Sequence, residues 1–125
     1  TLFNACAGNC FNGGNVDQMY ETFKAVLKPL PDETILYPGH DYMKTNLDFS
    51  LAWEPNNEDT TYWQRSVESL QPNDMPYMTL GQERLYNPFL RLESPSLIAK
   101  LEASGESITS SIAVFTALRS RRDKW

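Results

Sequence analysis

Short apolar runs and longer stretches with helical spacing alternate along the chain. Residues 1–7 form an apolar run that predicts a strand, and residues 34–37 are apolar and β-branched enough to predict a second, buried strand. Between them, Met19, Phe23 and Leu27 recur at helical spacing. We therefore expect a helix over residues 16–28, with Asn15 as its N-cap and the prolines that follow as its end.

The remainder of the chain has a helical pattern interrupted by segments rich in Pro, Asn and Gly. Helices are expected over residues 42–53, 58–70, 80–86, 96–103 and 110–122, and a loop over residues 71–76. The change from mixed strand and helix to helix alone predicts a piece of an α/β layer followed by a helical appendage. We place the division between residues 1–57 and residues 58–125.

The composition and net charge of the chain exclude several classes of protein. The formal net charge is -5 with 41% hydrophobic residues, which favours a globular domain and argues against a general nucleic-acid binder. No apolar run is long enough to cross a bilayer, and the first residues do not resemble a signal or transit peptide. Arg119, Arg121, Arg122 and Lys124 lie within six residues. They are either cations that favour a helix C-terminus or part of an anion site.

His40 is the single histidine, and it follows a Pro-Gly turn at the end of the second predicted strand. That position displays a side chain for metal binding or catalysis, although a histidine there can also simply hydrogen-bond a neighbour. The glycine-rich segment 8–14 lacks the spacing of a nucleotide-binding loop, and no serine stands in a nucleophile elbow. Cys6 and Cys10 match neither a redox pair nor a zinc set, so they are expected to be reduced structural thiols, with a small-ring disulfide as the alternative.

Several ordered motifs together resemble the C-terminal half of glyoxalase II, the hydroxyacylglutathione hydrolase of the metallo-β-lactamase superfamily. They are Thr-Leu-Phe-Asn-Ala at 1–5, Tyr-Pro-Gly-His-Asp-Tyr at 37–42, Asn-Leu at 46–47, Trp-Glu-Pro at 53–55, Glu83, and Asn-Pro-Phe-Leu-Arg at 87–91. The resemblance implies an α/β fold, the C-terminal half of an αββα sandwich, followed by an all-helical C-terminal domain that binds substrate.

The resemblance implies roles in metal binding and substrate binding for individual residues. His40 is the last ligand of a centre with two divalent metal ions, zinc or else iron or manganese, and Tyr42, Arg119 and Arg122 hold the glutathione part of the substrate. The family commonly has a basic residue and a tyrosine where Asn9 and Phe11 stand. The implied reaction is the hydrolysis of an S-2-hydroxyacylglutathione thioester, as in methylglyoxal detoxification.

Other family features are absent from these residues. The chain contains no His-x-His-x-Asp-His segment and starts after the position of the bridging aspartate, so no catalytic residue is assigned and the isolated chain is expected to be inactive. A missing N-terminal half, or a partner chain covering the exposed sheet, is expected to complete it. The alternatives are a non-catalytic subunit derived from glyoxalase II and an iron oxygenase acting on persulfides. A cytoplasmic or mitochondrial location is expected.

Overall fold

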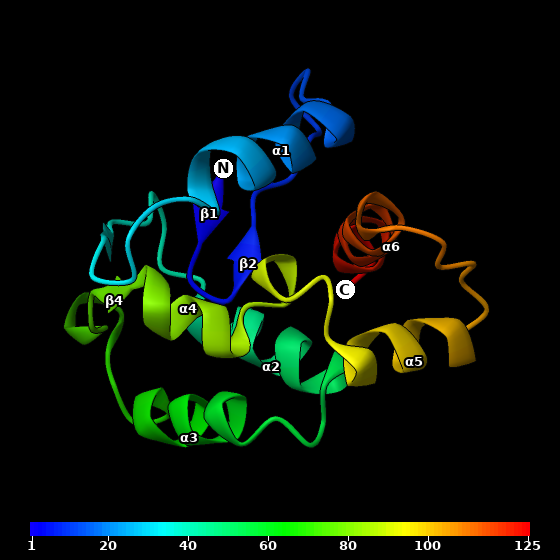
Figure 1. The fold of residues 1–125 in the computed structure, drawn as a ribbon. Coiled ribbons are helices and arrows are strands. Elements are labelled where there is room, and N and C mark those ends of the chain that lie inside the picture. The colour runs from blue at the N-terminus through cyan, green and yellow to red at the C-terminus, as the bar shows by residue number, and fades with distance from the viewer.

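A computed structural model describes all 125 residues and shows a helix-rich chain (Figure 1). The six α-helices are α1 (Val16–Thr22), α2 (Met43–Trp53), α3 (Glu58–Val67), α4 (Leu80–Tyr86), α5 (Pro95–Ala103) and α6 (Ser111–Asp123). Two short 3₁₀ turns, η2 (Pro72–Asp74) and η3 (Pro88–Leu90), lie in the connections. None of the helices has the length and apolar content that a membrane crossing requires.

The single strand expected over residues 1–7 is wrong, because these residues fold back as a hairpin. Strand β1 (Leu2–Phe3) pairs antiparallel with β2 (Cys6–Ala7), with Phe3 opposite Cys6. Ala5 in the turn has φ of 57°, a left-handed conformation that is unfavourable for a residue with a Cβ. Its backbone N–H donates to the buried carboxylate of Glu83 at 2.8 Å. A contact from 78 positions away therefore holds the turn, and local sequence does not reveal it.

The second predicted strand exists but is not buried. Strand β3 (Ile35–Leu36) pairs only with β4 (Met78–Thr79), and Ile35 is 49% exposed. Strand β4 lies in the part of the chain expected to be entirely helical. The strands form two separate two-stranded sheets, so the helical part of the predicted fold is present and the αββα sandwich is not shown by this chain.

The helical pattern predicted most helices to within a few residues, and α4 matches its prediction at both ends. The first predicted helix is divided: α1 ends at Thr22 and continues as a π-helix, η1 (Phe23–Leu27). The expected N-cap is confirmed, because the Asn15 side chain accepts a hydrogen bond from the Gln18 backbone N–H at 3.0 Å.

Two apolar clusters form the core. In the larger cluster, the Phe115 ring makes edge-to-face contacts with Phe23 and Phe89 at 5.1 and 5.2 Å. The smaller cluster includes Met43 and Met78. Each cluster contains residues from before and after position 57, so the two predicted parts share their core. The division into two domains stays a prediction.

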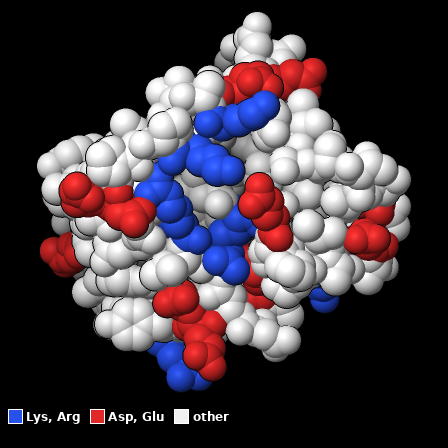
Figure 2. Space-filling view, in the orientation of Figure 1, with Lys and Arg blue, Asp and Glu red and all other residues white.

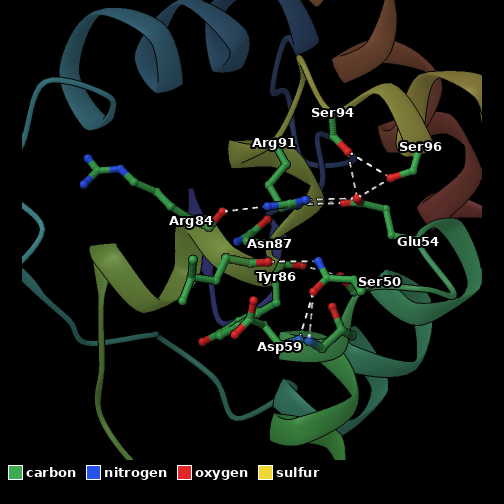
Figure 3. A network of polar contacts seen from close by, with 12 residues as sticks. Ser50, Glu54, Asp59, Arg84, Tyr86, Asn87, Arg91, Ser94 and Ser96 are labelled. Atoms are coloured by element: carbon green, nitrogen blue, oxygen red, sulfur yellow. Dashed lines mark hydrogen bonds and ion pairs between the residues drawn. The ribbon is translucent and has the colours of Figure 1, made fainter.

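A buried carboxylate joins the end of α2 to the start of α5 (Figure 3). Glu54 is only 3% exposed and accepts two hydrogen bonds from the Arg91 guanidinium, at 2.8 and 3.1 Å. The hydroxyls of Ser94 and Ser96 donate to the same carboxylate at 2.8 and 2.9 Å. Burial alone would raise the pKa of Glu54, but these hydrogen bonds and the charge of Arg91 outweigh it and hold the pKa below its usual value.

Acid is therefore expected to weaken the fold through Glu54. A carboxyl group whose pKa is lowered by folding stabilises the protein above its unfolded pKa, near 4.5, and loses that contribution as the pH falls through the folded value. Urea unfolding between pH 7 and pH 3 should show the loss below about pH 4.5. Glu54→Gln should cost about 3 kcal/mol at pH 7 and flatten this decline. Glu93→Gln, at an exposed position, should leave the decline unchanged; an equal flattening there would contradict the assignment.

Candidate functional site

A cavity of about 450 Å³ lies where the β1–β2 hairpin meets the segment before α2 and the end of α6. All six residues predicted as site residues line it: Asn9, Phe11, His40, Tyr42, Arg119 and Arg122. The fold thus brings together residues from three separate segments of the chain, 9–11, 40–42 and 119–122. Their individual roles in metal or substrate binding stay predictions.

Stacking of aromatic rings, without hydrogen bonds, holds the imidazole of His40. The His40 and Tyr42 rings are parallel to within 9° at a centroid distance of 5.3 Å, and Phe3 lies 6.3 Å from His40. Both ring nitrogens are left without a hydrogen-bond partner in the protein, and the residue is exposed. The reading of His40 as a histidine that merely hydrogen-bonds a neighbour is not supported by this geometry. An exposed imidazole with free nitrogens remains available as a ligand.

Arg119 is a structural tie between the two ends of the chain. Its guanidinium is 4% exposed and donates to the carbonyls of Ala7 and Gly8 at 2.6 and 2.8 Å, and it pairs with Asp123 at 2.9 Å. The Phe89 ring lies 5.7 Å from it. Since most of its donors are occupied, Arg119 has little capacity left for a ligand.

Arg122 differs from Arg119 because it keeps an unused donor. Its Nη2 donates to the Asn46 side chain at 3.1 Å, while its Nε has no partner in the protein. Arg121, between them in sequence, points elsewhere and pairs with Glu106 at 2.9 Å. Of the C-terminal cations, Arg122 is therefore the one with free hydrogen-bonding capacity at the cavity.

Asn46 also lines the cavity, although its sequence pattern predicted no role for it there. It is 2% exposed, donates to the Asn4 carbonyl at 2.9 Å, and accepts from Arg122. It thereby connects the hairpin turn to the arginine. An amide on the apolar face of α2, beside Leu47, is the signal that could have identified it, because a buried amide requires partners.

The loop after β2 is open. Asn9 is exposed, its side chain accepts a hydrogen bond from the Phe11 N–H at 3.2 Å, and Phe11 is 70% exposed. Cys6 and Cys10 are both free thiols, so the prediction of reduced cysteines is confirmed and the disulfide alternative is wrong. Burial raises the pKa of the Cys6 thiol, although the nearby Arg119 and Arg122 act in the opposite direction. A buried thiol of raised pKa is a poor nucleophile.

The chain does not form a metal centre by itself. No group of three or more His, Cys, Asp or Glu side chains is arranged to hold a metal ion. Besides His40, the cavity contains Asp123, which is paired with Arg119, and the buried thiol of Cys6. These residues do not fit the two-metal centre that the family resemblance implies.

Residues 41–125 match the family model described as the hydroxyacylglutathione hydrolase C-terminus. A hydroxyacylglutathione hydrolase of Polaromonas sp. (strain JS666) is 45% identical over 128 residues, which cover 100% of this chain and 49% of the relative. The corresponding proteins of Nitrosococcus oceani and Neisseria meningitidis serogroup C are 43% and 36% identical, again over 100% of this chain and over 49% and 48% of their own lengths. The chain spans about half the length of the curated relatives that it matches.

Proposed function

The chain belongs to the hydroxyacylglutathione hydrolase family, and on that premise we propose that it is the C-terminal portion of an enzyme that hydrolyses S-2-hydroxyacylglutathione thioesters. The observation that carries the proposal is the convergence of six predicted site residues on one cavity. The names of the relatives favour the hydrolase over the non-catalytic subunit and over the iron oxygenase.

The cavity of this chain is proposed to bind the glutathione part of the substrate. Glutathione carries carboxylates, and a guanidinium binds a carboxylate through paired, charge-assisted hydrogen bonds. Arg122 is the cation with a free donor, and Tyr42 beside it in the lining offers a hydroxyl from an exposed ring. Phe11 and Asn9 add one apolar and one amide contact at the open rim. Arg119 would act mainly by holding the hairpin in place.

His40 is proposed to contribute one metal ligand, and the N-terminal half the others. Two divalent metal ions, zinc or else iron or manganese, would then lie at the junction of the two halves, where they supply a hydroxide at neutral pH. The N-terminal half would also complete the αββα sandwich. In support, β3 and β4 leave apolar side chains uncovered: Ile35 is exposed, and the exposed rings of Tyr37 and Tyr77 lie 4.9 Å apart.

A chimera tests the proposed function. The N-terminal half of the Polaromonas relative, joined to this chain, should form a folded protein that binds zinc and hydrolyses S-D-lactoylglutathione. This chain alone should show no turnover because it lacks the other ligands. A chimera that folds and carries two zinc ions per molecule, yet leaves the thioester intact, would contradict the proposal.

Arg122 and Arg119 are expected to affect different measurements. Arg122→Ala in the active chimera should raise KM about tenfold with a small change in kcat, because one carboxylate contact is lost. Its free energy of unfolding should fall by about 1–2 kcal/mol, because the buried side-chain oxygen of Asn46 loses its donor. Arg119→Ala should instead cost about 3 kcal/mol in stability, since it leaves Asp123 and two buried carbonyls unpaired.

Arg121→Ala is the matched control, because it removes the same charge from the same helix outside the cavity. It should leave KM unchanged. If Arg121→Ala raises KM as much as Arg122→Ala does, the effect is one of overall charge and the assignment of Arg122 is wrong.

A further inference from the structure

A second cavity, of about 480 Å³, opens on the face shown in Figure 2 and shares no lining residue with the first. Its wall is formed by α1 and η1, by α4, by the segment that follows η3, and by the first residue of α6. Figure 2 shows Lys and Arg side chains gathered around this hollow. They are Lys24, Lys28, Arg84 and Arg91.

The charge of this wall is opposite to that of the whole chain. Four cations line the cavity and Glu93 is its single carboxylate, whereas the chain has a net charge of -5. A concave surface with one sign of charge and apolar walls concentrates ions of the opposite sign. The excess of cations in this lining therefore favours an anion.

The two arginines form a fixed part of the wall. Arg84 pairs with Asp32 and donates to the carbonyls of Lys28 and Leu30 at 3.0 and 2.7 Å. Arg91 is held by Glu54, as Figure 3 shows. Neither Asp32 nor Glu54 lines the cavity. The guanidinium groups are thus oriented before any ligand arrives, and Asp32 and Glu54 offset much of their charge, which leaves the two lysines as the available cations.

The two lysines are free to contact a ligand. Lys24 forms no ion pair, and its ammonium group lies 5.9 Å from the centre of the Tyr20 ring. Lys28 pairs with Glu93 at 3.8 Å, but the two side chains are 72% and 83% exposed. A long ion pair between exposed side chains contributes little and is readily exchanged for another anion.

The floor of the cavity is apolar. Tyr20, Leu90 and Leu92 line it and are half-buried, together with the core residues Phe23 and Phe89, which are only 3% and 1% exposed. A bare inorganic anion would leave this surface unused, while an organic body would cover it. The volume falls in the range of small-molecule sites.

We propose that this cavity binds a small organic anion, with a phosphate or carboxylate head group at Lys24 and Lys28 and an apolar body against Tyr20, Leu90 and Leu92. The site is independent of the proposed thioester hydrolysis, because it shares no residue with the first cavity. The ligand class follows from the wall: ammonium groups for the head group and aromatic carbon for the body.

Calorimetric titration at low ionic strength tests the site, using the complete protein that contains these residues. The probes are phenyl phosphate and benzoate as organic anions, inorganic phosphate as a head group without a body, and phenol as a body without a charge. The double variant Lys24→Gln/Lys28→Gln removes the two free cations. The matched control Lys100→Gln/Lys124→Gln removes the same charge from exposed lysines outside the cavity.

Saturable binding of phenyl phosphate or benzoate at one site, about tenfold weaker in Lys24→Gln/Lys28→Gln and little changed in the control, would support the proposal. Inorganic phosphate and phenol should both bind more weakly than phenyl phosphate, and this result would support a ligand with a charged head group and an apolar body. Three outcomes would overturn it: no saturable binding of either organic anion, an equal loss of affinity in both double variants, or binding of phenol as tight as that of the anions.

Discussion

Glu83→Ala is expected to cost about 3–5 kcal/mol in the free energy of unfolding, a large part of the stability of a domain of this size. The Glu83 carboxylate is completely buried and accepts from the Asn4 amide at 3.0 Å and the Ala5 N–H at 2.8 Å. The Asn87 amide and the Tyr86 hydroxyl donate to it as well. Alanine would leave these donors buried without a partner and release the strained turn at Ala5.

Urea unfolding at pH 7 measures this effect, and Glu93→Ala is the control. Glu93 lies in the neighbouring segment but is 83% exposed in its side chain, so its loss should change stability by less than about 0.5 kcal/mol. Glu83→Gln should cost more stability than Glu93→Ala and less than Glu83→Ala. The side-chain amide keeps the volume of the carboxylate, but its NH₂ group faces a donor where Glu83 offers an acceptor. A change below about 1 kcal/mol for Glu83→Ala would show that the turn does not depend on this carboxylate.

His40→Ala is expected to have the largest effect on activity, a loss of at least about a hundredfold in kcat/KM for thioester hydrolysis by the chimera. His40 is the single histidine of the chain, and its imidazole lines the cavity. It is the proposed metal ligand from this half of the enzyme. Its removal should also lower the zinc content, which a metal analysis measures without reference to turnover. Stability should change little, since the residue is exposed and makes no hydrogen bond.

Tyr42→Phe is the companion variant. It keeps the ring that stacks on His40 and removes only the hydroxyl, so zinc content should stay unchanged while KM rises. Full zinc content together with full activity in His40→Ala would exclude His40 as a ligand, even if the family assignment holds.

Most helices could be predicted from the sequence because their apolar positions recur every three or four residues. An N-cap such as Asn15, or a proline in the first turn such as Pro95, marks their starts. The hairpin could not be predicted. Its turn contains neither Gly nor Asn-Gly at the left-handed position, and it depends on Glu83 from a distant helix. The prediction that β3 is buried was wrong for a related reason. The apolar composition of a strand does not reveal how many neighbouring strands or helices cover it, and β3 pairs only with β4.

For the site, local pattern identified His40, through its Pro-Gly turn, and offered Arg119 and Arg122 as part of an anion site or as cations at a helix end. The other three residues, and the roles of all six, came from the family resemblance, because nothing in their spacing predicts that they meet. The structure adds distinctions that neither source contained. It separates Arg119, which holds the hairpin, from Arg122, which keeps a free donor, and it identifies Asn46 as the link between the hairpin turn and Arg122.

The Arg119 tie has a consequence for the order in which the chain folds during synthesis. Its partner carbonyl on Ala7 lies 112 positions earlier, so the hairpin leaves the ribosome long before the helix that fixes it. Until α6 is made, the carbonyls of Ala7 and Gly8 lack the guanidinium of Arg119 as their donor. The first cavity is therefore incomplete until α6 is made, and a nascent chain stalled before this helix exposes the hairpin to chaperones and proteases.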